Sequence, residues 1–262
     1  MSQKRQPAAI DETLRQKGAI TTLARDYAAG HAISRHYHDR DQLIYASRGV
    51  MTVGTPDGTW VVPTHRAVWV PAGIAHRIRM SGIVEMRTLY LASGVAKHMP
   101  KKCCVVNVSP LLRELIMAAC RHGNLHGAVS SQRHIMQMIA DELSGAETLA
   151  LRLPHPSDPR AAKVAAVLLN RPDDPRTLAQ ICELGLGGRR TIERAFVEDV
   201  GMTFGKWRQQ LRLIHAMQLL AAGAKVTHAA LEAGYSTPSA FIAMFKRTLG
   251  TTPKAYFKAS AG

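Results

Sequence analysis

Between residues 21 and 95 the chain alternates short apolar runs with turn residues. Runs such as QLIYASRG, TWVVP, AVWVPAG and VEMRTLYLA are separated by turn signals that include PDG at 56–58 and PAG at 71–73. Short strands at this regular spacing are typical of a β-sandwich or a small β-barrel. The polar segment that precedes them, 1–20, has no sustained period and is predicted to be a flexible arm.

The pattern then becomes helical. Ser109 followed by Pro110 is typical of an N-cap with proline at the first helical position, and apolar residues recur after it at helical spacing. A second helical stretch covers about 129–143. An apolar stripe of this kind packs on its own domain or forms an interface with a second copy of the chain, and the sequence leaves both open. We expect 108–151 to be a helical segment for dimerisation or docking.

Residues 152–160, RLPHPSDPR, carry three prolines and are predicted to be a linker. Beyond them the pattern is helical to about residue 258, so the predicted fold class is α+β, with an all-α domain over 161–258. Two segments in that domain share one design: LAQICELGLGGRRTIERAF at 178–196 and THAALEAGYSTPSAFIAMF at 227–245. Each has a short amphipathic helix, a glycine-bearing turn and a helix that ends in phenylalanine. Each is therefore predicted to be a helix-turn-helix unit.

The second helix of each unit is a candidate for DNA recognition. Gly234 is expected to supply a left-handed turn and Thr237 the cap of the following helix, which leaves one helix face free to enter the major groove. In the first unit that face carries side chains suited to guanine and cytosine edges. They are Arg189, Arg190, Glu193 and Arg194. The alternative is an ordinary solvated face with ion pairs such as Arg189–Glu193.

The amphipathic stretch between the two units, about 204–222, is expected to be a rigid connecting helix. About 18 residues at 1.5 Å each span about 27 Å. Successive major-groove turns on one face of DNA lie about 34 Å apart. Two recognition helices fixed on such a connector are therefore expected to occupy successive turns of the groove.

Composition favours a polyanionic partner. The 262 residues include 34 Lys and Arg against 19 Asp and Glu, a formal net charge of +15, so nucleic acid is the first candidate. No window of about 18 residues is apolar enough to span a membrane, and the N-terminal residues do not form a secretory signal. We therefore expect a cytoplasmic protein without a membrane partner. The four cysteines have no metal-binding spacing.

Residues 234–257, GYSTPSAFIAMFKRTLGTTPKAYF, resemble the C-terminal signature of AraC/XylS-type transcriptional regulators. The resemblance covers about 161–258 and implies a double helix-turn-helix domain that reads DNA and controls transcription. The expected partners are double-stranded promoter DNA, RNA polymerase if the protein is an activator, and a second copy in a homodimer. In the second unit the matching base-contact positions and the expected phosphate anchors are Thr237, Ser239, Ala243, Lys246 and Arg247.

Two positions depart from that family pattern. Leu186 stands where glycine is usual in the first turn, although glycines flank it, which indicates a slightly shifted turn. Ala243 stands where a basic residue is frequent. The second unit is therefore expected to read thymine methyl groups or to anchor mainly on phosphate through Lys246 and Arg247.

The β domain carries a second resemblance. The pattern G-x5-H-x-H-x3-Q-x6-G at 30–49, followed by P-x-G-x2-H at 71–76, resembles the two cupin motifs. It implies that 21–107 is a small cupin-like β-barrel, an effector or sensor domain with a central pocket. The positions that match the cupin metal ligands are His36, His38, Gln42 and His76.

Three interpretations of that pocket stay open. Three imidazoles and an amide oxygen suit a divalent metal in an open site, although glutamine in place of the usual glutamate removes a negative charge and lowers the expected affinity. The second interpretation is a metal-free pocket whose histidine and glutamine side chains bond a small organic effector. The third is a set of structural histidines without a ligand.

These observations predict a ligand-responsive, sequence-specific DNA-binding transcriptional regulator of AraC type, not an enzyme, which senses a small molecule or a metal through its cupin-like pocket. The alternative is a metal-dependent cupin enzyme with an accessory helical domain. Residues 161–258 discriminate between the two, because an enzyme does not need two helix-turn-helix units with basic side chains.

Overall fold

A computed structural model describes residues 18–149 and 152–258. Most of the predicted arm, 1–20, lies outside the described residues, and Ile20 already begins a strand. No helix in the described part of the chain is long and apolar enough to cross a membrane.

The described residues form two compact units. The first comprises residues up to 55 together with 60–152, and the second comprises 56–59 together with the residues from 153 onward. A β-sheet with two helices makes up the first unit, and helices dominate the second. The predicted α+β fold class is therefore confirmed.

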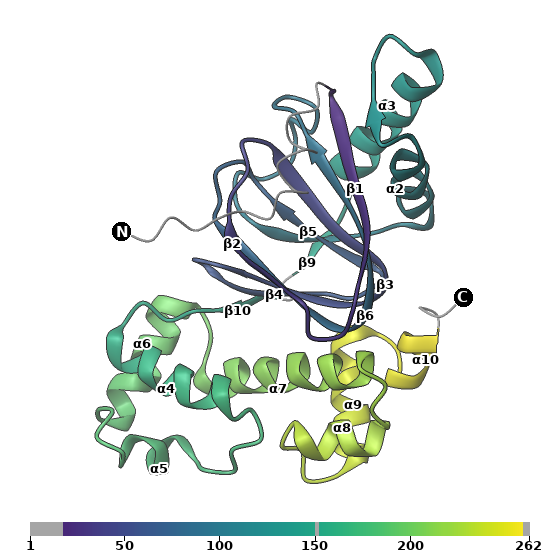
Figure 1. The fold of residues 1–262 in the computed structure, drawn as a ribbon. Coiled ribbons are helices and arrows are strands. Elements are labelled where there is room, and N and C mark those ends of the chain that lie inside the picture. The colour runs from purple at the N-terminus through teal and green to yellow at the C-terminus, as the bar shows by residue number, and fades with distance from the viewer. Residues whose placement is uncertain (1–17, 150–151, 259–262) are drawn as a thin grey trace. The chain divides into compact units, whose positions relative to one another are not determined.

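The first unit is built on a curled, largely antiparallel sheet (Figure 1). Its strands, with the short strand that follows, are β1 (Ile20–Tyr27), β2 (Ala32–His36), β3 (Asp41–Thr55), β4 (Gly58–Val62), β5 (Arg66–Val70), β6 (His76–Leu91), β7 (Cys104–Asn107), β8 (Asn124–Leu125), β9 (Thr148–Leu149) and β10 (Arg152–Pro154). Hydrogen-bonded neighbours follow the order β8-β1-β6-β3-β5-β7-β9, while β2 pairs with β6 and β4 with β3. The predicted turn at 56–58 joins β3 to β4.

Alternation along β3 gives the sheet two different faces. Leu43 and Tyr45 belong to the core that the sheet shares with α2 (Pro110–His122) and α3 (Ser130–Ser144). Gln42 lies on the opposite face of the sheet. It is directly opposite Tyr90 of β6 in the pairing of the two strands. One face of the strand therefore packs on helices, and the other lines the interior of the curled sheet.

The predicted cap of α2 is confirmed, because the Leu112 N–H donates to Ser109 Oγ at 2.9 Å. The buried apolar residues of the two helices are Leu112, Leu115, Ile116 and Ala119 of α2 and Ile139 and Leu143 of α3. Both apolar stripes thus pack on their own unit. Leu111 and Met138 stay exposed, at 46% and 42%.

The second unit holds two helix-turn-helix pairs joined by a long helix (Figure 1). Its helices are α4 (Pro159–Asn170), α5 (Leu178–Cys182), α6 (Arg189–Val200), α7 (Phe204–Ala221), α8 (Val226–Glu232), α9 (Pro238–Leu249) and α10 (Pro253–Lys258). The pairs are α5–α6 and α8–α9, and α7 connects them. The predicted cap at Thr237 is confirmed, since its hydroxyl accepts from Ala240 N, and the Thr177 hydroxyl caps α5 in the same way by accepting from Gln180 N.

Aromatic side chains hold each pair to the connecting helix or to its neighbour. Trp207 of α7 is fully buried and meets the ring of Phe196 of α6 edge-on, with centroids 5.3 Å apart. In the second pair Phe241 contacts Phe245, which in turn contacts Tyr256 of α10, with centroids 5.6 and 5.5 Å apart. The second helix of each pair is therefore fixed by one face.

The turn between α5 and α6 has Leu186 where glycine is usual, and the glycines on either side supply the conformation that the turn needs. Gly185 and Gly187 have φ values of +78° and +117°, in the region that favours glycine. Leu186 between them keeps a negative φ. Gly188 then caps α6, so the helix begins at Arg189.

Candidate DNA-reading helices and histidine pocket

Helix α6 presents the arginine-bearing face that the sequence predicts. The helix packs through Ile192 and Phe196, which are both fully buried. Of the four predicted contact residues, the three arginines are exposed and Glu193 is partly buried. Arg189 and Arg190 stand in the first helical turn, where the helix dipole disfavours positive charge. The charges of Arg189 and Arg190 therefore do not stabilise the helix.

The predicted ion pair on this face is present. Arg189 Nε lies 2.9 Å from Glu193 Oε1, and Arg194 Nε lies 3.9 Å from Glu198 Oε2. All four side chains are at least 44% exposed. Such pairs contribute a few tenths of a kcal/mol, about 0.2–0.5, so exchanging them for contacts with a polyanion costs little.

Helix α9 holds the predicted residues of the second unit on its outer side. Ser239, Ala243, Lys246 and Arg247 are exposed, whereas Phe241, Met244 and Phe245 are buried. The Thr237 hydroxyl is exposed and accepts the Ala240 N–H at 3.2 Å, so it already serves as a cap. Lys246 and Arg247 lie in the last turn, where positive charge interacts favourably with the helix dipole and stabilises the helix.

Sequence reasoning missed Val197 on α6. It follows Glu193 by four residues and Arg194 by three, which places it on the same face one turn further on. Its side chain is 53% exposed. Helical spacing is the signal that could have located this exposed apolar residue beside the arginines.

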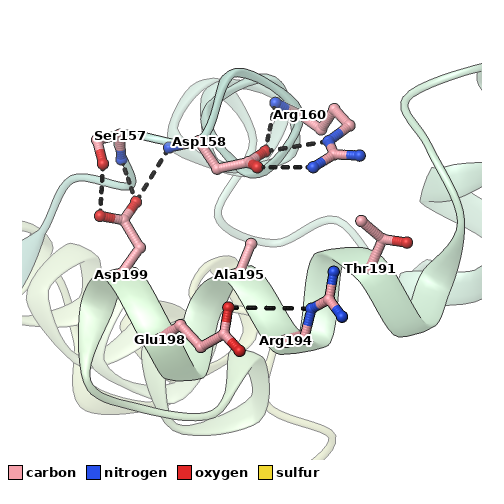
Figure 2. Close-up of a pocket in the computed structure, with 8 residues that line it drawn as sticks. All are labelled: Ser157, Asp158, Arg160, Thr191, Arg194, Ala195, Glu198 and Asp199. Atoms are coloured by element: carbon pink, nitrogen blue, oxygen red, sulfur yellow. Dashed lines mark hydrogen bonds and ion pairs between the residues drawn. The ribbon is translucent and has the colours of Figure 1, made fainter.

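A charged groove of about 410 Å³ separates α6 from the start of α4. In Figure 2, Asp199 of α6 points toward Ser157 and Asp158, the residues that lead into α4. Its carboxylate accepts the Ser157 hydroxyl at 2.5 Å, the Ser157 N–H, and the Asp158 N–H at 3.0 Å. The pKa of Asp199 is held below its usual value, and the hydrogen bond from the Ser157 hydroxyl is the largest cause. The end of the predicted linker, 152–160, is therefore hydrogen-bonded to the predicted DNA-reading helix.

Replacing Asp199 by alanine removes these three acceptor contacts, so we expect the free energy of unfolding to fall by about 1 kcal/mol. Glu198→Ala is the matched control: it removes a carboxylate from the same turn, 3.9 Å from Arg194, and is expected to change stability by less than about 0.5 kcal/mol. Urea unfolding followed by circular dichroism measures both variants. Equal losses would contradict the structural role of Asp199.

Three histidines meet on the inner face of the sheet. His36 ends β2, His38 follows it, and His76 begins β6. All three are buried, with 6%, 4% and 1% exposure. One ligand nitrogen from each lies within 4.8 Å of the other two. Gln42 of β3, the fourth predicted residue, is 2% exposed and is also on the inner face.

Hydrogen bonds orient two of the rings. His36 Nδ1 lies 2.6 Å from the Ser34 carbonyl oxygen, and His76 Nδ1 lies 3.0 Å from the Ile74 carbonyl oxygen. A backbone carbonyl only accepts, so each Nδ1 carries the proton and each Nε2 keeps a lone pair. Histidine ligands of metals are commonly oriented in this way.

Several polar atoms in the pocket have no hydrogen-bond partner among the described residues. They are both ring nitrogens of His38, Nε2 of His76 and Oε1 of Gln42. The Gln42 amide nitrogen donates to Thr88 Oγ1 at 3.3 Å, which orients the oxygen away from that contact. Buried polar atoms without partners are unfavourable, so this set is better explained by a ligand than by a purely structural role.

Burial keeps the histidines neutral. Together with the neighbouring His36 and His76, which act in the same direction, it lowers the pKa of His38 to about 3. Burial also lowers the pKa of His76 to about 4 and that of His36 below its usual value. Neutral imidazoles are the form that binds metals. The residues present therefore fit a divalent transition metal, with three nitrogen donors and an amide oxygen.

A sheet with a buried histidine cluster, joined in one chain to two helix-turn-helix pairs, is the arrangement expected of a DNA-binding regulator with a ligand-binding domain. Residues 19–143 match the model of the AraC-like ligand binding domain, and residues 184–259 match a helix-turn-helix domain model. The chain belongs to the AraC family of helix-turn-helix transcriptional regulators. The alternative of a cupin enzyme is thereby set aside.

Curated relatives agree with this assignment. The chain is 34% identical over 221 residues to the HTH-type transcriptional regulator NimR of Escherichia coli strain K12, which covers 84% of this chain and 81% of that protein. It is 36% identical over 106 residues to the HTH-type transcriptional regulator RipA of Corynebacterium diphtheriae, which covers 40% of this chain and 32% of that protein.

The chain is also similar to solved structures. ToxT from Vibrio cholerae aligns with 93% of this chain and 100% of its own, at 13% identity and a TM-score of 0.40. An AraC-type transcriptional regulator from Chromobacterium violaceum aligns with 40% of this chain and 95% of its own, at 24% identity and a TM-score of 0.37.

Proposed function

We propose that α6 and α9 read two adjacent segments of promoter DNA and that the histidine pocket controls this reading by binding a divalent metal. The observation that carries the first part is the exposed arginine face of α6. The basic residues of this face stand at the helix N-terminus, where they do not stabilise the fold. The opposite face of the helix packs on buried aromatic rings. Contact with a polyanion accounts for this arrangement.

The two helices divide the recognition between them. On α6, Arg190 and Arg194 suit guanine O6 and N7, and Glu193 suits the cytosine amino group. On α9, Ala243 suits a thymine methyl group, while Lys246 and Arg247 suit phosphates. The first unit would then supply most base preference and the second most of the electrostatic anchoring.

The pocket favours a metal over an organic effector on grounds of space. The ring centroids of His36 and His76 are 4.4 Å apart, and those of His36 and His38 are 4.7 Å apart. In a tetrahedral site with metal–nitrogen distances of about 2.1 Å, donor nitrogens are about 3.4 Å apart. The histidine nitrogens already lie within 4.8 Å of one another, so an approach of the rings would bring them to an ion, and their close packing favours an occupant of that size over an organic molecule.

The ligand can act only by differential binding. A bound ion would hold β2, β3 and β6 through His36, His38, Gln42 and His76, and it shifts an equilibrium only if one state of the protein holds it more tightly. We place the second copy of a homodimer on the exposed outer faces of α2 and α3. RNA polymerase would be a further partner if the protein activates transcription.

Arg190→Ala and Arg194→Ala test the reading function. Each is expected to weaken binding by roughly 1–3 kcal/mol and to relax base preference at one position. The probe is a duplex that the wild-type chain selects from a random pool, together with its single-base-pair variants, each measured by gel shift at two salt concentrations. Lys163→Ala, which removes a positive charge from the exposed side of α4, is the control. If the arginine variants keep the wild-type order of preference over all duplexes, α6 is not the reading helix.

A further inference from the structure

The loop between α4 and α5 turns its backbone carbonyls toward the connecting helix. Arg208 of α7 donates from Nη1 to the Arg176 carbonyl oxygen at 2.6 Å and from Nη2 to that of Asp174. Arg212, one turn further along α7, donates to the carbonyl oxygens of Asp174 at 3.1 Å and Pro172 at 3.4 Å. This loop leads directly into the first helix-turn-helix pair.

The acidic side chain in the loop is engaged elsewhere. The Asp174 carboxylate is 1% exposed and is bonded by Arg176, whose Nη2 lies 2.5 Å away. The two arginines of α7 therefore bond peptide oxygens, and neither forms an ion pair with a carboxylate among the described residues. Arg208 and Arg212 are both partly buried. Desolvating two neighbouring guanidinium groups is unfavourable. The hydrogen bonds that they make to the loop must offset this cost.

Arg212 also lies against the turn of the second pair. Gly234, between α8 and α9, has a φ of +79°. A Cβ atom built on it would lie 2.9 Å from both Cζ and Nη2 of Arg212. The next residue, Tyr235, packs on Phe241 of α9 with ring centroids 5.2 Å apart. One guanidinium thus touches the loop that enters the first pair and the turn that positions the second reading helix.

We propose that Arg212 is the positioning residue that fixes the spacing between the two reading helices, and that it thereby sets the spacing of the two DNA segments that the protein accepts. The proposal rests on the proposed function, since it needs both helices on one duplex. A planar group bonded on one side and packed on the other resists sliding of either pair along α7. Without it, each pair keeps its own core while their separation becomes adjustable.

The test measures tolerance to spacing. Duplexes selected by the wild-type chain from a random pool are rebuilt with one or two base pairs inserted or removed between the two contacted segments. One base pair moves a segment by about 3.4 Å and rotates it by about 34°. Arg212→Gln is compared with Arg208→Gln, the matched control, because Arg208 bonds the same loop whereas the nearest atoms to a Cβ on Gly234 all belong to Arg212.

The wild-type chain and Arg208→Gln are expected to prefer the selected spacing over its variants by at least roughly tenfold. Arg212→Gln is expected to reduce that ratio to about threefold or less, chiefly by binding the altered spacings better. A full wild-type ratio in Arg212→Gln overturns the proposal, as does an equal reduction in Arg208→Gln. If Arg212→Gln does not fold, Arg212→Lys decides by the same ratio. A wild-type chain that selects no sequence from the pool refutes the proposed function itself, and the spacing role with it.

Discussion

Replacing Trp207 by alanine is expected to lower the free energy of unfolding of the helical unit by about 3–5 kcal/mol. The side chain is fully buried, meets Phe196 edge-on at 5.3 Å, and donates its Nε1–H to the Pro154 carbonyl oxygen at 2.8 Å. Domains of this size are stable by about 5–15 kcal/mol. The variant is therefore close to unfolding, and DNA binding falls with it because α6 loses its support.

Trp207→Phe separates the two contributions of this side chain. It keeps most of the aromatic surface against Phe196 but leaves the Pro154 carbonyl without its donor, so a smaller loss of about 1–2 kcal/mol is expected. Urea unfolding of the full chain, followed by circular dichroism, measures both variants. If Trp207→Ala unfolds at the wild-type urea concentration, the connecting helix does not hold α6 through this residue.

The sequence predicts helix starts and turns well because their signals are local. Helix starts at Ser109, Thr177 and Thr237 depend on a side chain that bonds an amide three residues away, and such caps can be seen in a short stretch of sequence. The exposed face of α6 follows from helical spacing in the same way. Turn residues at 56–58 likewise locate the junction of β3 and β4.

Contacts between distant residues were not visible in the sequence. Asp199 bonds residues about forty positions earlier, and Arg212 bonds Asp174 across a comparable distance. Neither belongs to a motif, because the fold alone brings them together. For the pocket, the cupin resemblance predicts four residues, but the partnerless atoms of His38 and Gln42 that favour a ligand appear only in three dimensions.

His76→Ala is expected to abolish stoichiometric binding of a divalent transition metal. The wild-type chain, incubated with excess Zn²⁺ and desalted, should retain about one ion per chain, because the histidine nitrogens converge within 4.8 Å and are neutral. Removing one of three nitrogen donors leaves two and a neutral amide oxygen, which lacks the charge of the carboxylate found in zinc sites with two histidines. Elemental analysis measures the content. His134→Ala, on the exposed side of α3, is the control that should bind as the wild type does.

Gln42→Glu provides the opposite change in the same pocket. A carboxylate in place of the amide restores the usual cupin ligand and adds a negative charge, so we expect the affinity for Zn²⁺ to rise by roughly tenfold or more. Without metal the buried carboxylate is unfavourable beside neutral rings, so this variant should be less stable than the wild type until Zn²⁺ is added. Thermal unfolding with and without the ion measures that dependence. A wild-type chain that stays free of metal after reconstitution, with no stabilisation of either protein by Zn²⁺, would return the pocket to the organic-effector interpretation.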